Sequence, residues 1–108
     1  GNQLRDFVYV DDFTDALVRA VYSSEIGIFN VGSGNARSMR EVAQMAEEIA
    51  GVQDIVRPGA LPYRSQEVWK YCLDASATKK AFDWEARVTL EHGLRRTIAT
   101  RKQKRQPV

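Results

Sequence analysis

The segments of this chain that favour β-structure are few, short and far apart, and this spacing most restricts what the chain can fold into. Residues 4–10 contain the apolar run Phe7-Val8-Tyr9-Val10, and residues 28–31 form a second short run that we expect to be a strand buried on both faces. Further extended segments are expected only at 52–56 and 68–73. Strands so scattered cannot complete a sheet among themselves. We therefore predict an α/β chain that forms one part of a larger protein.

Helical signals fill the first half of the chain between these segments. Asp11 and Asp12 are expected N-caps, and apolar residues at helical spacing predict a helix that ends near Tyr22. Ser38 and Glu41, three positions apart, predict a capping box at the start of a second helix. Gly51 lies where a left-handed C-terminal glycine is expected.

The second half reads as a loop followed by two helices. Pro58, Gly59 and Pro62 predict an irregular loop over 57–65. Asp74 is the expected cap of a short helix from 75 to about 82, and Thr89 the expected cap of a final helix. That helix would place its apolar positions on an inner side, namely Leu90, Leu94 and Ile98.

Composition and charge exclude several classes of protein. No apolar run approaches the ~20 residues that span a membrane, and residues 1–6 lack the apolar core of a signal peptide. One cysteine and one histidine argue against a disulfide framework and a zinc site. These features favour a cytoplasmic protein without a bound metal.

Basic residues are concentrated at the end of the chain. Four of the 16 lie within 101–108, and the other 12 are outnumbered by 14 acidic residues. Such a segment can be an arm for nucleic acid or an acidic membrane, or a disordered, solvated terminus. We favour the second interpretation, and we expect neither a nucleic-acid nor a membrane partner.

Four segments, in order, resemble those of extended short-chain dehydrogenases, the family of nucleotide-sugar 4-epimerases and 4,6-dehydratases. They are Arg5-Asp6-Phe7-Val8-Tyr9-Val10-Asp11-Asp12, Phe29-Asn30-Val31-Gly32-Ser33-Gly34, Asp74-Ala75-Ser76 with Lys79, Lys80 and Trp84, and residues 89–98. The resemblance implies that residues 1–100 are the C-terminal, substrate-binding part of a Rossmann-type enzyme. It also implies a homodimeric, NAD-dependent parent that acts through a 4-keto sugar. It does not separate epimerase, dehydratase and decarboxylase.

The motifs with which this family binds NAD and performs chemistry are missing from the sequence. The segment Gly32-Ser33-Gly34 fails the dinucleotide fingerprint because Arg37 stands at its third glycine position. No tyrosine is followed by lysine four residues later. We therefore expect no catalytic or cofactor-binding residue in this chain, an NAD site in a domain upstream of Gly1, and no activity from this chain alone.

The resemblance also implies a substrate site. Arg5 and Arg64 would contact the diphosphate, Glu67 the ribose hydroxyls, and Tyr71 would lie near the substrate. Guanidinium groups offer paired donors to phosphate oxygens, and a carboxylate can accept from two vicinal hydroxyls. The alternatives are surface ion pairs for the three charged residues and a half-buried strand position for Tyr71. For Trp69, packing is favoured over stacking on a nucleobase.

A chain of 108 residues could also be a stand-alone binding or interaction module without enzymatic activity. That alternative needs no missing domain. The order and register of the four family segments favour the enzyme part.

Overall fold

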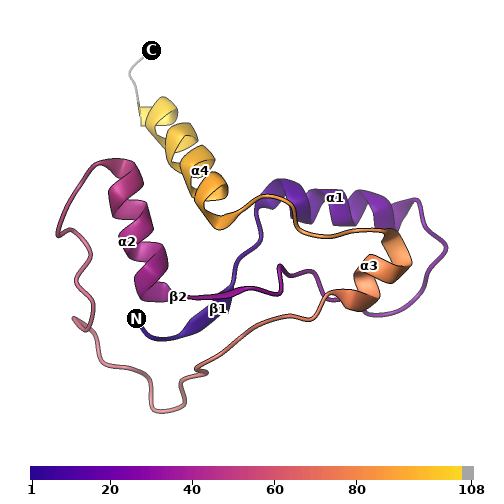
Figure 1. The fold of residues 1–108 in the computed structure, drawn as a ribbon, viewed down its shortest axis with the longest axis horizontal. Coiled ribbons are helices and arrows are strands. Elements are labelled where there is room, and N and C mark those ends of the chain that lie inside the picture. The colour runs from indigo at the N-terminus through magenta and orange to yellow at the C-terminus, as the bar shows by residue number, and fades with distance from the viewer. Residues whose placement is uncertain (106–108) are drawn as a thin grey trace.

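The computed structural model describes residues 1–105, which form four helices and a two-stranded sheet (Figure 1). The elements are β1 (Leu4–Asp6), α1 (Val10–Val21), β2 (Ala36–Ser38), α2 (Met39–Ala50), α3 (Ser76–Phe82) and α4 (Leu90–Arg105). Strands β1 and β2 are antiparallel, with Leu4 opposite Ser38 and Asp6 opposite Ala36. On its other side, Leu4 forms a parallel bridge with Lys70. The sheet therefore joins three segments that are distant in sequence.

The predicted caps of α2 are confirmed, whereas those of α1 are wrong. The backbone N–H of Glu41 donates to Ser38 Oγ at 3.1 Å, and Gly51 adopts φ 72° after the last turn of α2. Helix α1 begins earlier than predicted, with Tyr9 as its N-cap and no side-chain cap. Asp11 and Asp12 lie inside its first turn, where carboxylates complement the partial positive charge of the helix end.

The four predicted extended segments are all shorter than expected or absent. The strand predicted over 4–10 ends at Asp6, because α1 starts at Val10. Residues 28–31 and 52–56 form no strand in the described chain, so the expectation of a strand buried on both faces is wrong. Ile28 is 99% exposed, and Asp54 has a left-handed φ of 55°. Of the extended segment expected over 68–73, only Lys70 takes part in a bridge. Residues 28–31 and 52–56 have no neighbouring strand in the described chain that could pair with them.

Helix α4 begins where the sequence indicates, whereas α3 begins one residue later than predicted, with Ala75 and not Asp74 as its N-cap. The backbone N–H of Ser76 donates to Asp74 Oδ1 at 2.9 Å, and that of His92 donates to Thr89 Oγ1 at 3.2 Å. Helix α4 continues to Arg105, so the expectation of a disordered tail is wrong over 101–105. Lysine, arginine and glutamine are good helix formers, and cations suit a helix C-terminus. The remainder of the predicted tail, 106–108, lies outside the described residues.

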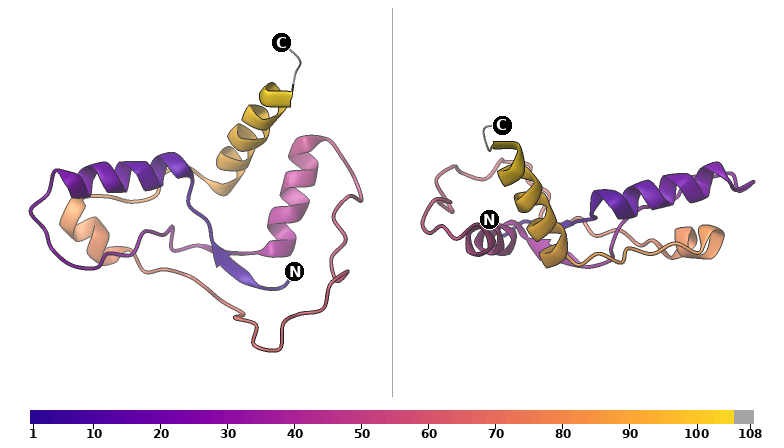
Figure 2. Two further views of the ribbon diagram at one scale, coloured as in Figure 1. Left: turned by 180° about the vertical axis from the view of Figure 1, so that it is seen from behind. Right: turned by 90° about the horizontal axis from the view of Figure 1, so that it is seen from above.

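The molecule is flat, with dimensions of 48 × 45 × 18 Å. Helices α2 and α4 lie at one end and α1 and α3 at the other, with the sheet between them (Figure 2). In the described chain, only Ala16 and Trp84 are buried apolar residues. None of the described helices is long and apolar enough to cross a membrane.

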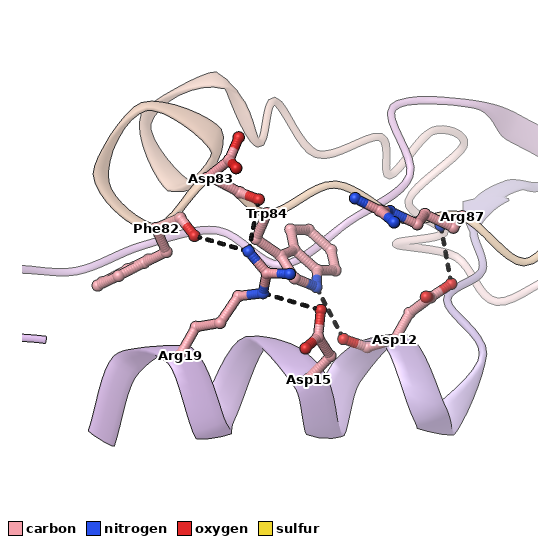
Figure 3. A network of polar contacts seen from close by, with 7 residues as sticks. All are labelled: Asp12, Asp15, Arg19, Phe82, Asp83, Trp84 and Arg87. Atoms are coloured by element: carbon pink, nitrogen blue, oxygen red, sulfur yellow. Dashed lines mark hydrogen bonds and ion pairs between the residues drawn. The ribbon is translucent and has the colours of Figure 1, made fainter. Parts of the chain in front are cut away.

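A polar network fastens α1 to the segment that follows α3 (Figure 3). Trp84 Nε1 donates to the backbone carbonyl of Asp12 at 2.9 Å. The Asp12 carboxylate accepts from the backbone N–H groups of Arg87 and Val88 at 3.0 and 2.9 Å. Arg19 donates to the carbonyls of residues 82 and 83, the last of which caps α3. These bonds join α1 to the end of α3 and to residues 84–88.

Candidate functional site

Side chains alternate across β1 and the segment beside it, and this alternation separates two faces. Leu4, Lys70 and Cys72 line a hollow of about 580 Å³ on one face. Arg87 also lines it, but none of the predicted site residues does. Arg37 borders the hollow as well, although it lies directly opposite Arg5 in the sheet and therefore projects its side chain from the Arg5 face. Arg5 projects from the other face of β1, where it meets the side chains of Glu67 and Tyr71. The predicted substrate residues therefore gather on the face opposite the hollow.

Arg5 is held by three contacts. Its Nη1 donates to the carbonyl of Leu4 at 2.8 Å, and its Nη2 donates to Glu67 Oε1 at 3.2 Å. Its guanidinium carbon lies 5.3 Å from the centre of the Tyr71 ring, in cation–π range. A guanidinium carries five N–H donors, so these bonds orient the group without exhausting its donors.

Glu67 is the most enclosed member of the group, with 12% of its side chain exposed. It forms the ion pair that the alternative interpretation of Arg5 expected, across 62 residues of chain. The bond to Arg5 engages Oε1, and no hydrogen bond from another described residue reaches Oε2. The carboxylate therefore positions Arg5 and keeps an acceptor for another donor.

Arg64 stands apart from this group. It is exposed, in the loop that precedes Glu67, and makes no hydrogen bond or ion pair with another residue between 1 and 105. Its neighbour Tyr63 anchors the loop, because the Tyr63 hydroxyl accepts from the backbone N–H of Asn2 at 3.1 Å. The structure thus brings Arg5, Glu67 and Tyr71 together and places Arg64 on an adjoining anchored loop.

Asp6 holds the turn at 32–34 and the backbone of Leu73, a role that sequence reasoning missed. Its carboxylate accepts from the hydroxyl and backbone N–H of Ser33 and from the backbone N–H groups of Gly34 and Leu73. Partial burial alone would raise the pKa of Asp6, but the bonds from Ser33, Leu73 and Gly34 outweigh it and hold that pKa below 3.8. The signal in the sequence is an aspartate at a strand end followed by a glycine-rich turn.

The turn at 32–34 does not fit the pyrophosphate of a dinucleotide. A dinucleotide-binding turn aims free backbone N–H groups at phosphate oxygens. Here the N–H groups of Ser33 and Gly34 donate to Asp6. A Cβ at Gly32 would lie 2.5 Å from the Cβ of Leu73, so this glycine permits close packing of two segments. The turn serves the fold.

Comparison with known proteins identifies what this arrangement resembles. A family model described as GDP-mannose 4,6 dehydratase matches residues 1–97. The chain is 29% identical over 99 residues to the UDP-glucuronate 4-epimerase of Thermodesulfobacterium geofontis, covering 91% of this chain and 30% of that protein. It is 33% identical over 99 residues to the UDP-glucose 4-epimerase of Mycolicibacterium smegmatis, covering 91% of this chain and 31% of that protein.

Solved structures agree with these matches. The UDP-glucose 4-epimerase of Thermotoga maritima, solved with UDP-glucose, has a TM-score of 0.89 and 31% identity, covering 98% of this chain and 34% of that one. MoeE5, solved with UDP-glucuronic acid and NAD, has a TM-score of 0.86 and 29% identity, covering 96% of this chain and 35% of that one. The chain thus spans about a third of the length of each of these relatives.

Proposed function

Because the chain belongs to the GDP-mannose 4,6-dehydratase family of extended short-chain dehydrogenases, we propose that it is the nucleotide-sugar-binding part of an NAD-dependent epimerase or dehydratase. The observation that carries the proposal is the gathering of Arg5, Glu67 and Tyr71 on one face from segments 62 residues apart. A fixed guanidinium beside a carboxylate and an aromatic ring suits a ligand that combines phosphate with hydroxyl groups. The parent reaction would pass through a 4-keto sugar.

Each residue of the group receives a role in this proposal. Arg5 and Arg64 bind the diphosphate from two separate segments, and a bidentate guanidinium does this better than a lysine ammonium. Glu67 accepts from the ribose hydroxyls through Oε2 while Oε1 keeps Arg5 in position. Tyr71 supports the Arg5 guanidinium at the edge of the sugar. Anchoring groups that do not react is how such an enzyme positions the reacting carbon.

The cofactor belongs elsewhere in this proposal. NAD would supply the hydride acceptor of the reaction. In the glycine-rich turn at 32–34, however, the backbone N–H groups of Ser33 and Gly34 donate to Asp6. We assign NAD to a part of the parent protein outside this chain. The chain alone would therefore bind a nucleotide diphosphate without turning over a sugar.

Calorimetry with UDP and with uridine tests the diphosphate role of Arg64. Charge-assisted bonds are worth about 1.5–3 kcal/mol. Arg64→Ala should therefore weaken UDP binding by roughly one to two powers of ten and leave uridine binding unchanged. Arg57→Ala is the matched control, because Arg57 is an exposed arginine of the same loop outside the family motif. Equal losses with Arg57→Ala would sink the assignment, as would equal losses of UDP and uridine.

Glu67→Gln tests the ribose role in the same experiment. The amide keeps an acceptor but loses the charge that pairs with Arg5, so binding of both UDP and uridine should weaken, and the loss of UDP affinity should be smaller than in Arg64→Ala. A variant that weakens UDP alone would assign Glu67 to the positioning of Arg5 and remove it from the ribose.

A further inference from the structure

We propose that Trp69 stacks against the base of the bound nucleotide, an inference that rests on the proposed function and extends it to the recognition of the base. Trp69 lies between Glu67 and Tyr71 in the sequence, and 50% of its surface is exposed. The other tryptophan of the chain, Trp84, is 1% exposed and serves the fold.

The backbone places Trp69 on the substrate face. The N–H of Leu4 donates to the carbonyl of Trp69 at 2.8 Å, and the N–H of Tyr71 donates to the carbonyl of Leu4 at 2.9 Å. These bonds set the segment beside β1, with Lys70 directed to the hollow on the other face. Alternation then puts Trp69 on the side of Arg5, together with Tyr71.

The indole is held by a second aromatic residue. The rings of Tyr63 and Trp69 lie 4.6 Å apart, edge to face, at an interplanar angle of 69°. Tyr63 is itself fixed through its hydroxyl, which accepts from the backbone N–H of Asn2. A ring held in this way loses little conformational freedom when a ligand stacks on it.

Trp69 lies next to the residue that would bind the ribose, on the same side of the segment. Residues two apart in an extended segment are separated by about 6.5–7 Å, and the base of a nucleotide is bonded directly to its ribose. If Glu67 accepts from the ribose, the Trp69 side chain therefore lies one such step from the sugar that carries the base. The competing role for a half-exposed indole is packing against another part of the protein.

The experiment compares UDP with inorganic pyrophosphate, which lacks a base, on the full chain. Base stacking is worth about 1–3 kcal/mol, so Trp69→Leu should weaken UDP binding about tenfold and leave pyrophosphate binding unchanged. Trp69→Phe should restore most of the UDP affinity, because the replacement keeps an aromatic face. Tryptophan emission gives a second readout: UDP should quench the wild type, whereas Trp69→Phe, which retains only buried Trp84, should show no quenching.

The outcomes separate this inference from the function on which it rests. Equal weakening of UDP and pyrophosphate by Trp69→Leu would mean that the indole only packs, and would overturn the inference. Unchanged UDP binding in Trp69→Leu would overturn it as well, while the diphosphate site at Arg5 and Arg64 would stand. If the folded wild type binds neither UDP nor pyrophosphate, the proposed function fails and the inference falls with it.

Discussion

At the scale of single residues, Gly32 is the glycine with the least room for a side chain. A Cβ added there would lie 2.5 Å from Leu73 Cβ and 2.9 Å from Asp6 Oδ2. Gly32→Ala should therefore cost about 1–3 kcal/mol of unfolding free energy, measured by urea denaturation, because two segments would have to separate. Gly51→Ala is the control: its Cβ meets nothing within 4 Å, and it should lose only about 1 kcal/mol for a left-handed φ. Equal losses would contradict the tight packing at Gly32.

Asp6 gives a prediction for acid pH. Its pKa is lower in the folded chain than the ordinary value of 3.8, so its bonds stabilise the fold fully above that value. The contribution is lost as pH falls below 3.8 through the folded pKa. A carboxyl titration by NMR should find Asp6 below 3.8, and Ser33→Ala should raise it, since the Ser33 hydroxyl donates to Asp6 at 2.6 Å. An Asp6 pKa at or above 3.8 in the wild type would refute this account.

At the scale of elements, the carboxylate of Asp12 joins α1 to the chain that follows α3. It accepts from two backbone N–H groups, those of Arg87 and Val88, and is itself buried. Asp12→Ala leaves both donors without a partner and should cost about 1–3 kcal/mol in urea denaturation. Asp12→Asn keeps an acceptor oxygen and should lose less. If Asn and Ala variants were equally unstable, the charge of Asp12 rather than its bonds would hold the segments together.

The elements that sequence predicts well are those decided locally. Ser38, Gly51 and Thr89 cap or close helices through bonds within a few residues, and all three act as predicted, whereas the predicted cap Asp74 lies one residue before the observed N-cap, Ala75. The α/β fold of a Rossmann-type family is confirmed by the similarity to solved relatives. The strand predicted over 28–31 fails because a strand depends on a partner, and this chain supplies none there.

The candidate site was predictable only in part, because its residues come from segments that are remote in sequence. Family motifs pointed to Arg5, Glu67 and Tyr71, and the structure places these three together. The ion pair between Arg5 and Glu67 joins residues 62 apart, which no local pattern reveals. Asp6 was missed because its partners at 33, 34 and 73 are also remote in sequence.

At the scale of the whole molecule, the chain is more extended than an independent domain. Its radius of gyration is 16.7 Å, whereas a compact domain of this size has about 13 Å.

Calorimetry of the chain with NAD should show no saturable micromolar binding, since the backbone N–H groups of the turn at 32–34 donate to Asp6. Micromolar NAD binding by the purified chain would overturn the assignment of the cofactor to another part of the protein.

The exposed apolar residues of α1 and of the segment that follows it lead to the last prediction. Ile26 and Ile28 are 96% and 99% exposed, and residues 28–31 form no strand in the described chain. Unpaired backbone groups beside apolar side chains favour edge pairing between copies. The isolated chain should therefore self-associate, and light scattering should show a mass that rises with concentration. Ile28→Glu should reduce this association, because a charge on the pairing segment opposes burial. Leu61→Glu changes an equally apolar residue, 85% exposed, in the loop at the other end of the molecule and should leave association intact. A monomer at every concentration, or an equal effect of both variants, would show that residues 28–31 do not drive assembly.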